Sequence, residues 1–300
     1  MKSLHQSVLA VAVMLSAVFP AGAVDLRVVT WDVEDAYPLG KAAVLAQAIK
    51  KHKVDILALQ SVQTSGTRFD EIIQKELDKL VGRGVYRHAA TSGSRFDGNA
   101  IFWNTRMVQI AGVAVDKSLD PGRMSRPPVQ ILSVRAGSFE FQLVNVNLAE
   151  DHDVDGSQEM KRAERLCRLL KKIEGRDFRP VILAGNLDMG FPGEKVFDEV
   201  DDDDDEEDND AYERLNPDGF LHFCTRELAR KKPHVFSYVG DVLEGGRLTD
   251  HIAANAPAWK HYIKGSAEVV RIDREFYDDL DDYEWNFSDH LPVISEFKTK

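Results

Sequence analysis

Near its C-terminal end the chain has the stretch Asn286-Phe287-Ser288-Asp289-His290-Leu291-Pro292-Val293-Ile294, around which we interpret the other strand ends of the sequence. The polar triplet from Ser288 to His290 leads directly into an apolar run over residues 291–297, a pattern typical of a buried strand. A strand with an Asp and a His at its entrance can hold a metal ligand beside a proton-transfer group. An Asp-His pair can equally cap an ordinary loop, so the other strand ends must decide between these interpretations.

The first 23 residues differ in composition from everything that follows. Lys2 precedes an apolar run over residues 8–19, and Ala21-Gly22-Ala23 supplies a small-x-small cleavage site. This pattern predicts a secretory signal peptide over residues 1–23, too short to span a membrane. A buried N-terminal helix is the alternative, but the charged start and the cleavage site together favour export. We therefore expect a periplasmic or extracellular monomer without a transmembrane segment.

Most of the formal charge of −12 belongs to one tract. Residues 198–210 carry eleven acidic side chains and no basic one. So many like charges with so few apolar residues predict a disordered surface loop, with weak Ca²⁺ accumulation as the alternative. Near a binding site the tract would repel polyanions, which argues against long DNA as the substrate.

The two cysteines, Cys167 and Cys224, leave two states open. An exported protein can join them in a disulfide. Cys167 falls on the apolar side of a helical pattern, however, so a buried free thiol is equally compatible.

Strand-like and helical patterns alternate along residues 24–300, which we expect to form one domain. Helical spacing predicts helices over residues 39–49, 69–80 and 160–173. Strands are predicted over 26–31, 54–59, 85–90, 129–134, 139–148, 180–185 and 291–297, with weaker candidates at 235–239, 247–254 and 269–272. Residues 98–103 and 107–115 suggest a hairpin around a turn at 104–106. This mixture predicts α/β layers with mixed sheets.

Polar residues recur where the predicted strands end. They are Asp32 and Glu34, Ser61, Asn147, Asn186 and Asp188, Asp250 and His251, and Asp289 and His290. Strand ends are where open α/β sheets place their ligands. Carboxylate and amide oxygens suit Mg²⁺, Mn²⁺ or Ca²⁺ better than zinc.

The order of these motifs resembles the endonuclease/exonuclease/phosphatase superfamily, which includes deoxyribonucleases and secreted sphingomyelinases. The motifs are Thr30-Trp31-Asp32-Val33-Glu34, Asp55-Ile56-Leu57-Ala58-Leu59-Gln60, Gly98-Asn99-Ala100-Ile101, Leu143-Val144-Asn145-Val146-Asn147-Leu148, Val181-Ile182-Leu183-Ala184-Gly185-Asn186-Leu187-Asp188, Thr249-Asp250-His251-Ile252 and Ser288-Asp289-His290-Leu291-Pro292-Val293. The resemblance covers residues 24–300. It implies a four-layer α/β sandwich, with two packed mixed β-sheets flanked by helices.

The resemblance also implies roles, and the chain departs from several of them. The family has an Asn where this chain has Asp32, a metal-binding Glu where it has Ser61, and a His or Tyr where it has Asn147. The family's Gly-Asp-x-Asn becomes Gly185-Asn186-Leu187-Asp188, with acid and amide exchanged. The late motifs are intact: Asp250 matches the acid that orients the catalytic histidine, Asp289 matches a metal ligand, and His290 matches that histidine.

Four carboxylates nevertheless remain available, at positions 32, 188, 250 and 289. We therefore hypothesise a rearranged divalent-metal site in an exported phosphoesterase, with Mg²⁺, or Mn²⁺ or Ca²⁺, as the cofactor. The candidate metal ligands are Asp32, Asp188 and Asp289, with Ser61 at the lost Glu position. The candidate catalytic residues are His290, Asp250, Asp188, Asn186 and Asn147. The alternative is a catalytically weak or inactive member of the same fold that acts as a binding protein.

The substrate is expected to be a phosphoester, whether nucleic acid, phospholipid headgroup or small phosphate ester. Arg123 and Arg126, in a basic loop over residues 122–128, are candidate phosphate contacts, although a solvated basic loop has the same pattern. Asn99, in the third motif, is a further candidate for substrate binding. Composition and motifs alone do not choose among these substrates.

Overall fold

The computed structural model describes residues 25–33, 38–63, 68–91, 97–119, 128–148, 157–189, 191, 211–231, 235–239 and 247–300. The predicted signal peptide, the acidic tract and the candidates Glu34, Arg123 and Arg126 lie outside these residues.

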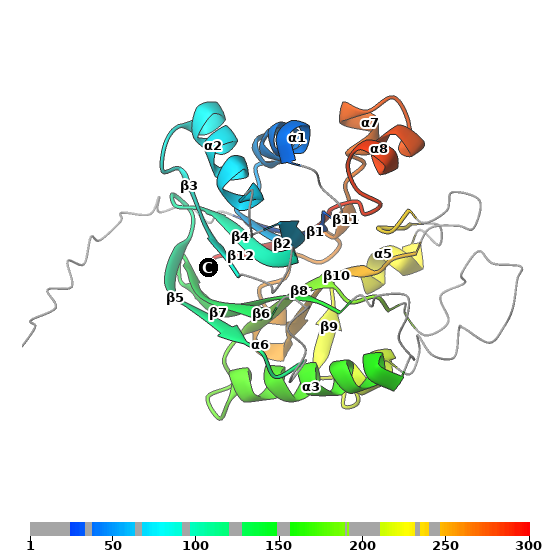
Figure 1. The fold of residues 1–300 in the computed structure, drawn as a ribbon. Helices are drawn as coiled ribbons and strands as arrows, with labels where there is room; N and C mark the ends of the chain where they lie inside the picture. Colours follow the sequence, from blue (N-terminus) through cyan, green and yellow to red (C-terminus); the bar gives the residue numbers. More distant parts are fainter. Residues whose placement is uncertain are drawn as a thin grey trace, which may run out of the picture.

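Two six-stranded sheets pack face to face at the centre of the molecule (Figure 1). In order across the first sheet, the strands are β11 (Glu268–Val269), β12 (Val293–Lys298), β1 (Asp25–Asp32), β2 (Ile56–Gln63), β4 (Asp97–Asn104) and β3 (Tyr86–Ala90). The second sheet is β5 (Gln109–Asp116), β6 (Val129–Ala136), β7 (Phe139–Asn147), β8 (Val181–Asn186), β10 (Asp250–Asn255) and β9 (Leu221–Phe223).

Helices cover the outer faces of both sheets (Figure 1). The helices α1 (Pro38–Lys51) and α2 (Phe69–Val81) lie on the first sheet, on the same side as α7 (Asp273–Phe276) and α8 (Leu280–Asn286). The amphipathic helix α3 (Ser157–Glu174) covers the second sheet, and the short helices α5 (Arg226–Lys231) and α6 (Ala256–Trp259) flank β9 and β10. The predicted four-layer α/β sandwich is confirmed.

Each sheet contains one parallel pair of strands at its centre. The strands β1 and β2 run parallel, as do β7 and β8, while the other paired strands are antiparallel. The register aligns Asp32 with Gln60 in one sheet and Asn147 with Asn186 in the other. Antiparallel β10 starts beside the end of β8, where Asp250 lies opposite Asn186. The polar strand ends therefore gather at one edge of the sandwich.

The hairpin predicted for residues 98–115 is wrong. The strand β4 already pairs with β2 on one side and β3 on the other, so no edge remains for β5. The chain instead crosses to the second sheet after Asn104, and β5 pairs with β6. Sequence proximity favoured a hairpin, but the hydrogen bonds of β4 were already satisfied by strands distant in sequence.

Both cysteines are free thiols buried in separate parts of the core. Cys167 lies in the apolar layer between α3 and the second sheet, and Cys224 lies between the two sheets. Of the two states that the sequence left open, the structure has the buried thiols. Among the described residues, no helix is both long and apolar enough to cross a membrane.

Candidate active site

Side chains from four strands meet at the polar edge of the sandwich. The Asn147 amide at the end of β7 donates from Nδ2 to Asp32 Oδ2 and to Ser61 Oγ, both at 3.0 Å. The Asn186 amide at the end of β8 also donates to Asp32 Oδ2, at 3.0 Å. Asp32 is fully buried and forms the point at which the two sheets are joined by these bonds.

Ser61 reaches this cluster because β2 carries an irregularity. The pairing of β2 with β4 shifts register between Leu59 and Val62, and Ser61 has a φ of 53°. Positive φ is uncommon outside glycine, and such conformations concentrate at functional sites. The buried side chain of Asn145 supports the irregular segment, because its Nδ2 donates to the Leu59 carbonyl at 3.0 Å and its Oδ1 accepts from Gln60 Nε2 at 2.6 Å.

The backbone of Asp188 helps to orient Asn186. Its φ is 50°, and its backbone N–H donates to Asn186 Oδ1 at 3.0 Å. Because that backbone donor occupies the amide oxygen, the amide nitrogen of Asn186 must face Asp32. Asp188 thus fixes the orientation of Asn186, and its role as a metal ligand stays a prediction.

A buried pair of His290 and Asp250 lies beside this cluster. His290 Nδ1 is 2.7 Å from Asp250 Oδ2, and His290 Nε2 is 3.7 Å from Asp289 Oδ1. Burial lowers the pKa of His290, but the charge and hydrogen bond of Asp250, with the charges of Asp32 and Asp289, outweigh it and raise the pKa overall. The carboxylates around this imidazole therefore favour its protonated form.

The turn that carries His290 is fastened on several sides. Ser288 Oγ donates to the Asp32 carbonyl at 2.9 Å and accepts from the His290 backbone N–H at 3.0 Å. The His290 carbonyl accepts from Trp31 Nε1 at 2.9 Å and from the Tyr283 hydroxyl. These bonds link β1, α8 and the entrance of β12, so the backbone that carries the His290 imidazole is held in place.

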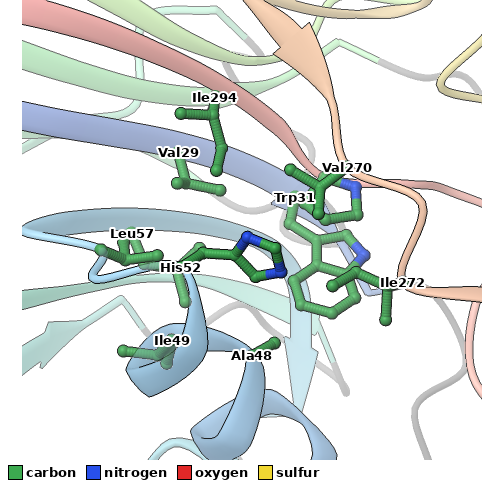
Figure 2. A pocket seen from close by; sticks show the side chains of 11 residues that line it. Val29, Trp31, Ala48, Ile49, His52, Leu57, Val270, Ile272 and Ile294 are labelled. Carbon is green, nitrogen blue, oxygen red and sulfur yellow. The ribbon is translucent and has the colours of Figure 1, made fainter. Parts of the chain in front are cut away.

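Trp31 also borders a small apolar cavity behind the site (Figure 2). The cavity has a volume of ≈ 20 Å³ between α1 and the outer face of the first sheet, with Val29, Ile49, Leu57 and Val270 in its walls. That volume is close to the minimum for a single water, about 10–15 Å³, and its lining is apolar. The cavity is therefore too small for a substrate.

Two buried carboxylate oxygens of this site have no hydrogen-bond donor among the described residues. Within the described part of the chain, Asp32 Oδ1 and Asp250 Oδ1 are buried and have no hydrogen-bond partner. Burial raises the pKa of Asp32, and the charge of His290 and hydrogen bonds with Ser61 and Asn186 act against that rise. Unpaired buried acceptors are costly and commonly mark the place of an ion or a water. This donor set fits a hard cation, although no group of three or more His, Cys, Asp or Glu side chains in the described ranges is placed to hold one unaided.

Comparisons with known proteins place this geometry in a familiar architecture. No protein-family model matches the chain, and no curated protein matches it. Among solved structures, the AP endonuclease of Archaeoglobus fulgidus is 16% identical, with a TM-score of 0.65 over 91% of this chain and 99% of that chain. The mannosyl-6-phosphatase of Bacteroides thetaiotaomicron is also 16% identical, with a TM-score of 0.61 over 90% and 98%. An endonuclease/exonuclease/phosphatase from Bacteroides vulgatus is 14% identical, with a TM-score of 0.60 over 91% and 98%. The chain has the endonuclease/exonuclease/phosphatase fold.

On this endonuclease/exonuclease/phosphatase fold, the structure brings most of the predicted residues together. One hydrogen-bonded group contains Asp32, Ser61, Asn147 and Asn186, and His290, with Asp250 and Asp289, lies close enough for its charge to act on Asp32. Asn99 does not join these residues through any described contact, since it is fully buried on β4 and donates to the Pro128 carbonyl at 3.1 Å. Its role in substrate binding stays a prediction, as do those of Arg123 and Arg126.

Three neighbours of the site escaped the sequence analysis. The Ser237 hydroxyl accepts from the backbone N–H groups of Thr249 and Asp250, at 3.1 and 2.9 Å. The ring of Tyr238 lies 5.0 Å from the His290 imidazole, and Arg247 pairs with Tyr238 through the backbone. Isolated bridges have no periodicity, so the only available signal was the weak strand pattern at 235–239 and 247–254.

Proposed function

We propose that this protein is a phosphoric ester hydrolase assisted by a divalent cation, and that its active site is the network around Asp32 and His290. One observation carries the proposal: the buried Asp250–His290 pair lies beside a second buried carboxylate, Asp32, with an oxygen that has no described partner. The fold supports it, because solved structures of this fold include an AP endonuclease and a mannosyl-6-phosphatase.

His290 is the group best suited to proton transfer or charge stabilisation at phosphate. Asp250 accepts from Nδ1, which fixes the ring and leaves Nε2 directed to the side where Asp289 lies. An imidazolium held in this way can donate from Nε2 to a phosphoryl oxygen. Asn147 and Asn186 cannot exchange protons, so their task is to hold the Asp32 carboxyl in place by donating to its Oδ2.

Asp32 Oδ1 and Asp289 are the groups that would hold the cation. A bound divalent ion would neutralise charge that develops on the phosphoryl oxygens. Magnesium is commonly bound by one or two protein carboxylates together with waters and the phosphate of the substrate. Because the protein offers few ligands of its own, we expect ion and phosphoester to bind together, each raising the affinity for the other.

The expected joint binding of the divalent ion and phosphate gives the first test. Calorimetric titration of Mg²⁺, Mn²⁺ and Ca²⁺ into the mature protein is compared with and without inorganic phosphate. We expect weak ion binding that strengthens when phosphate is present. Hydrolysis of bis(4-nitrophenyl) phosphate and 4-nitrophenyl phosphate is then measured with the preferred ion. Absence of both turnover and ion binding would contradict the proposal.

A binding protein without turnover is the second candidate function. Two observations favour it: Ser61 carries no charge at a position next to Asp32, and Asn186 cannot accept a proton from an attacking water. This candidate predicts phosphate binding in the first titration with no hydrolysis of either ester. The two candidates are therefore separated by the same pair of measurements.

We also propose that the protein is exported, which the composition of residues 1–23 supports. Cell fractionation followed by N-terminal sequencing tests this directly. The expected result is a mature chain that starts at Val24 outside the cytoplasm. An intracellular chain that keeps Met1 would contradict export.

A further inference from the structure

Arg247, Tyr238 and His290 stand side by side on three neighbouring segments of the chain. Tyr238 forms an antiparallel bridge with Arg247 on one side and with His290 on the other. Tyr238 and Arg247 exchange both backbone hydrogen bonds, at 2.8 and 3.1 Å. Val239 N–H donates to the Asp289 carbonyl at 2.7 Å, and Leu291 N–H donates to the Ser237 carbonyl at 2.6 Å. The three residues therefore form one row across a small antiparallel ribbon.

Residues opposite one another in antiparallel pairs project to the same face. The ring contact of 5.0 Å between Tyr238 and His290 agrees with this geometry. Arg247, on the other side of Tyr238, belongs to the same face, two strand spacings or about 10 Å from His290 by backbone position. Both Arg247 and Tyr238 are partly exposed. The ribbon thus carries an arginine, a tyrosine and a histidine in sequence, on one face by backbone position.

Electrostatics explains why the site requires a further cation. Three carboxylates, those of Asp32, Asp250 and Asp289, lie around one imidazole, so one bound divalent cation would leave the network without excess positive charge. A phosphoester adds further negative charge, which a second cationic group would offset. Arginine suits the task because its planar guanidinium can donate two parallel N–H bonds to phosphate.

The ribbon is also held rigidly against the catalytic pair. The Ser237 hydroxyl, one residue before Tyr238, accepts from the Thr249 and Asp250 backbones at 3.1 and 2.9 Å. The same short segment therefore fixes both the start of β10, which carries Asp250, and the entrance of β12, which carries His290. A phosphate bound on this ribbon would keep a constant position relative to both residues.

We infer that Arg247 binds a phosphoryl oxygen of the substrate, and that Tyr238 lies between this cation and His290 to set their spacing. The inference rests on the proposed function for the identity of the ligand as a phosphoester. It adds to that proposal the phosphate-binding element, from a part of the chain outside the predicted motifs. Arg247 is a substrate-binding residue here, and Tyr238 is a positioning residue.

Phosphate binding by Arg247 variants tests the inference. Inorganic phosphate, in the presence of Mg²⁺, is titrated into the wild type and the Arg247→Gln, Arg247→Lys and Arg87→Gln variants. Losing a hydrogen bond to a charged group costs about 1.5–3 kcal/mol, so we expect roughly 10- to 100-fold weaker binding for Arg247→Gln. Lysine should restore part of the affinity. Arg87, exposed on β3, is the matched control and should change nothing.

The outcomes separate this inference from the proposed function. Wild-type affinity in Arg247→Gln, or no phosphate binding by the folded wild type, would overturn the inference. Absence of turnover in the wild type would contradict hydrolysis while leaving the phosphate titration interpretable. Where turnover is measured, Arg247→Gln should raise KM, and Tyr238→Leu should lower kcat while Tyr238→Phe restores it. A Tyr238→Leu variant with normal kcat would overturn the positioning role. Thermal unfolding and the His290 imidazole NMR signals establish that each variant retains the folded site.

Discussion

The dipeptide Asp-His occurs three times in the sequence, and the two copies that the structure describes have different structural roles. In Asp250-His251 the Asp lies in the site, whereas His251 points to the other side of β10, into an aromatic cluster with Phe191 and Phe223. In Asp289-His290 the His is buried in the site, and the Asp lies at its partly exposed edge. Successive side chains on β10 alternate between faces, so His251 points away from the site that Asp250 enters, whereas Asp289 and His290 precede β12 and both approach the site.

The surroundings then give the two histidines different protonation states. His251 Nε2 donates to the Met189 carbonyl at 2.9 Å, while Nδ1 accepts from the Thr225 hydroxyl at 2.8 Å. Burial lowers the pKa of His251 to about 4, because the hydrogen bond with the Met189 carbonyl and the charge of Asp250 offset only part of its effect. His290, against Asp250, has a raised pKa. An Asp-His dipeptide therefore reveals little until strand position and neighbouring charge are known.

Among changes that keep both histidines, the largest effect is expected when the carboxylate next to His290 is removed or moved. Asp32→Asn should lower kcat/KM by about 10²–10³, the usual cost of losing one preorganised charge. The double variant Asp32→Asn/Asn186→Asp should recover part of that loss, because it moves the carboxylate across a single 3.0 Å hydrogen bond. Both are measured by steady-state hydrolysis of bis(4-nitrophenyl) phosphate. A double variant no better than Asp32→Asn would show that charge position, and not only charge number, limits the site.

A smaller effect, on the free energy of unfolding, is expected from the protonation of His251. The folded pKa lies below the unfolded value of 6.5, so between pH 6.5 and about pH 4 only the unfolded chain takes up this proton. The free energy of unfolding should fall as pH falls through that window, by about 3 kcal/mol in total. Urea unfolding of wild type and His251→Gln at several pH values isolates this contribution. Equal pH dependence in both proteins would contradict the assignment.

The smallest effect is expected from removing one of the two side-chain hydrogen bonds that the His290 carbonyl accepts. Tyr283→Phe removes one of two donors to the His290 carbonyl, and should cost about 1 kcal/mol of stability and roughly fivefold in kcat. Tyr86→Phe is the matched control, because its hydroxyl donates to the Val54 carbonyl at 2.5 Å, away from the site. The control should lose similar stability and no activity. Equal loss of kcat in both variants would show that Tyr283 acts only through general stability.

Much of the fold followed from the sequence because its signals are local and periodic. The apolar runs of β2 and β8 and the amphipathic face of α3 predicted their elements closely. The positions of Asp32, Asn147 and Asn186 at strand ends predicted their meeting at one edge. Asn147 and Asn186 end the parallel strands β7 and β8, which finish side by side, and Asp32 ends β1 of the facing sheet.

The remaining features depend on contacts between distant parts of the chain. The separation of β4 from β5 follows from the strands that already flank β4. The position of Ser61 follows from a register shift that the buried Asn145 supports. The Tyr238 ribbon consists of single bridges, which leave no repeating pattern. None of these is encoded in local spacing, which explains why Tyr238 and Arg247 were missed.

The most direct test compares the two histidines in one assay. We would measure kcat/KM for bis(4-nitrophenyl) phosphate in His290→Asn, which keeps a donor for Asp250, and in His251→Gln at neutral pH. Loss of a positioned acid–base group typically costs about 10²–10⁴ in rate, so His290→Asn should fall by that amount while His251→Gln retains wild-type activity. Wild-type activity in His290→Asn, or a loss confined to His251→Gln, would contradict a catalytic site built on Asp250 and His290.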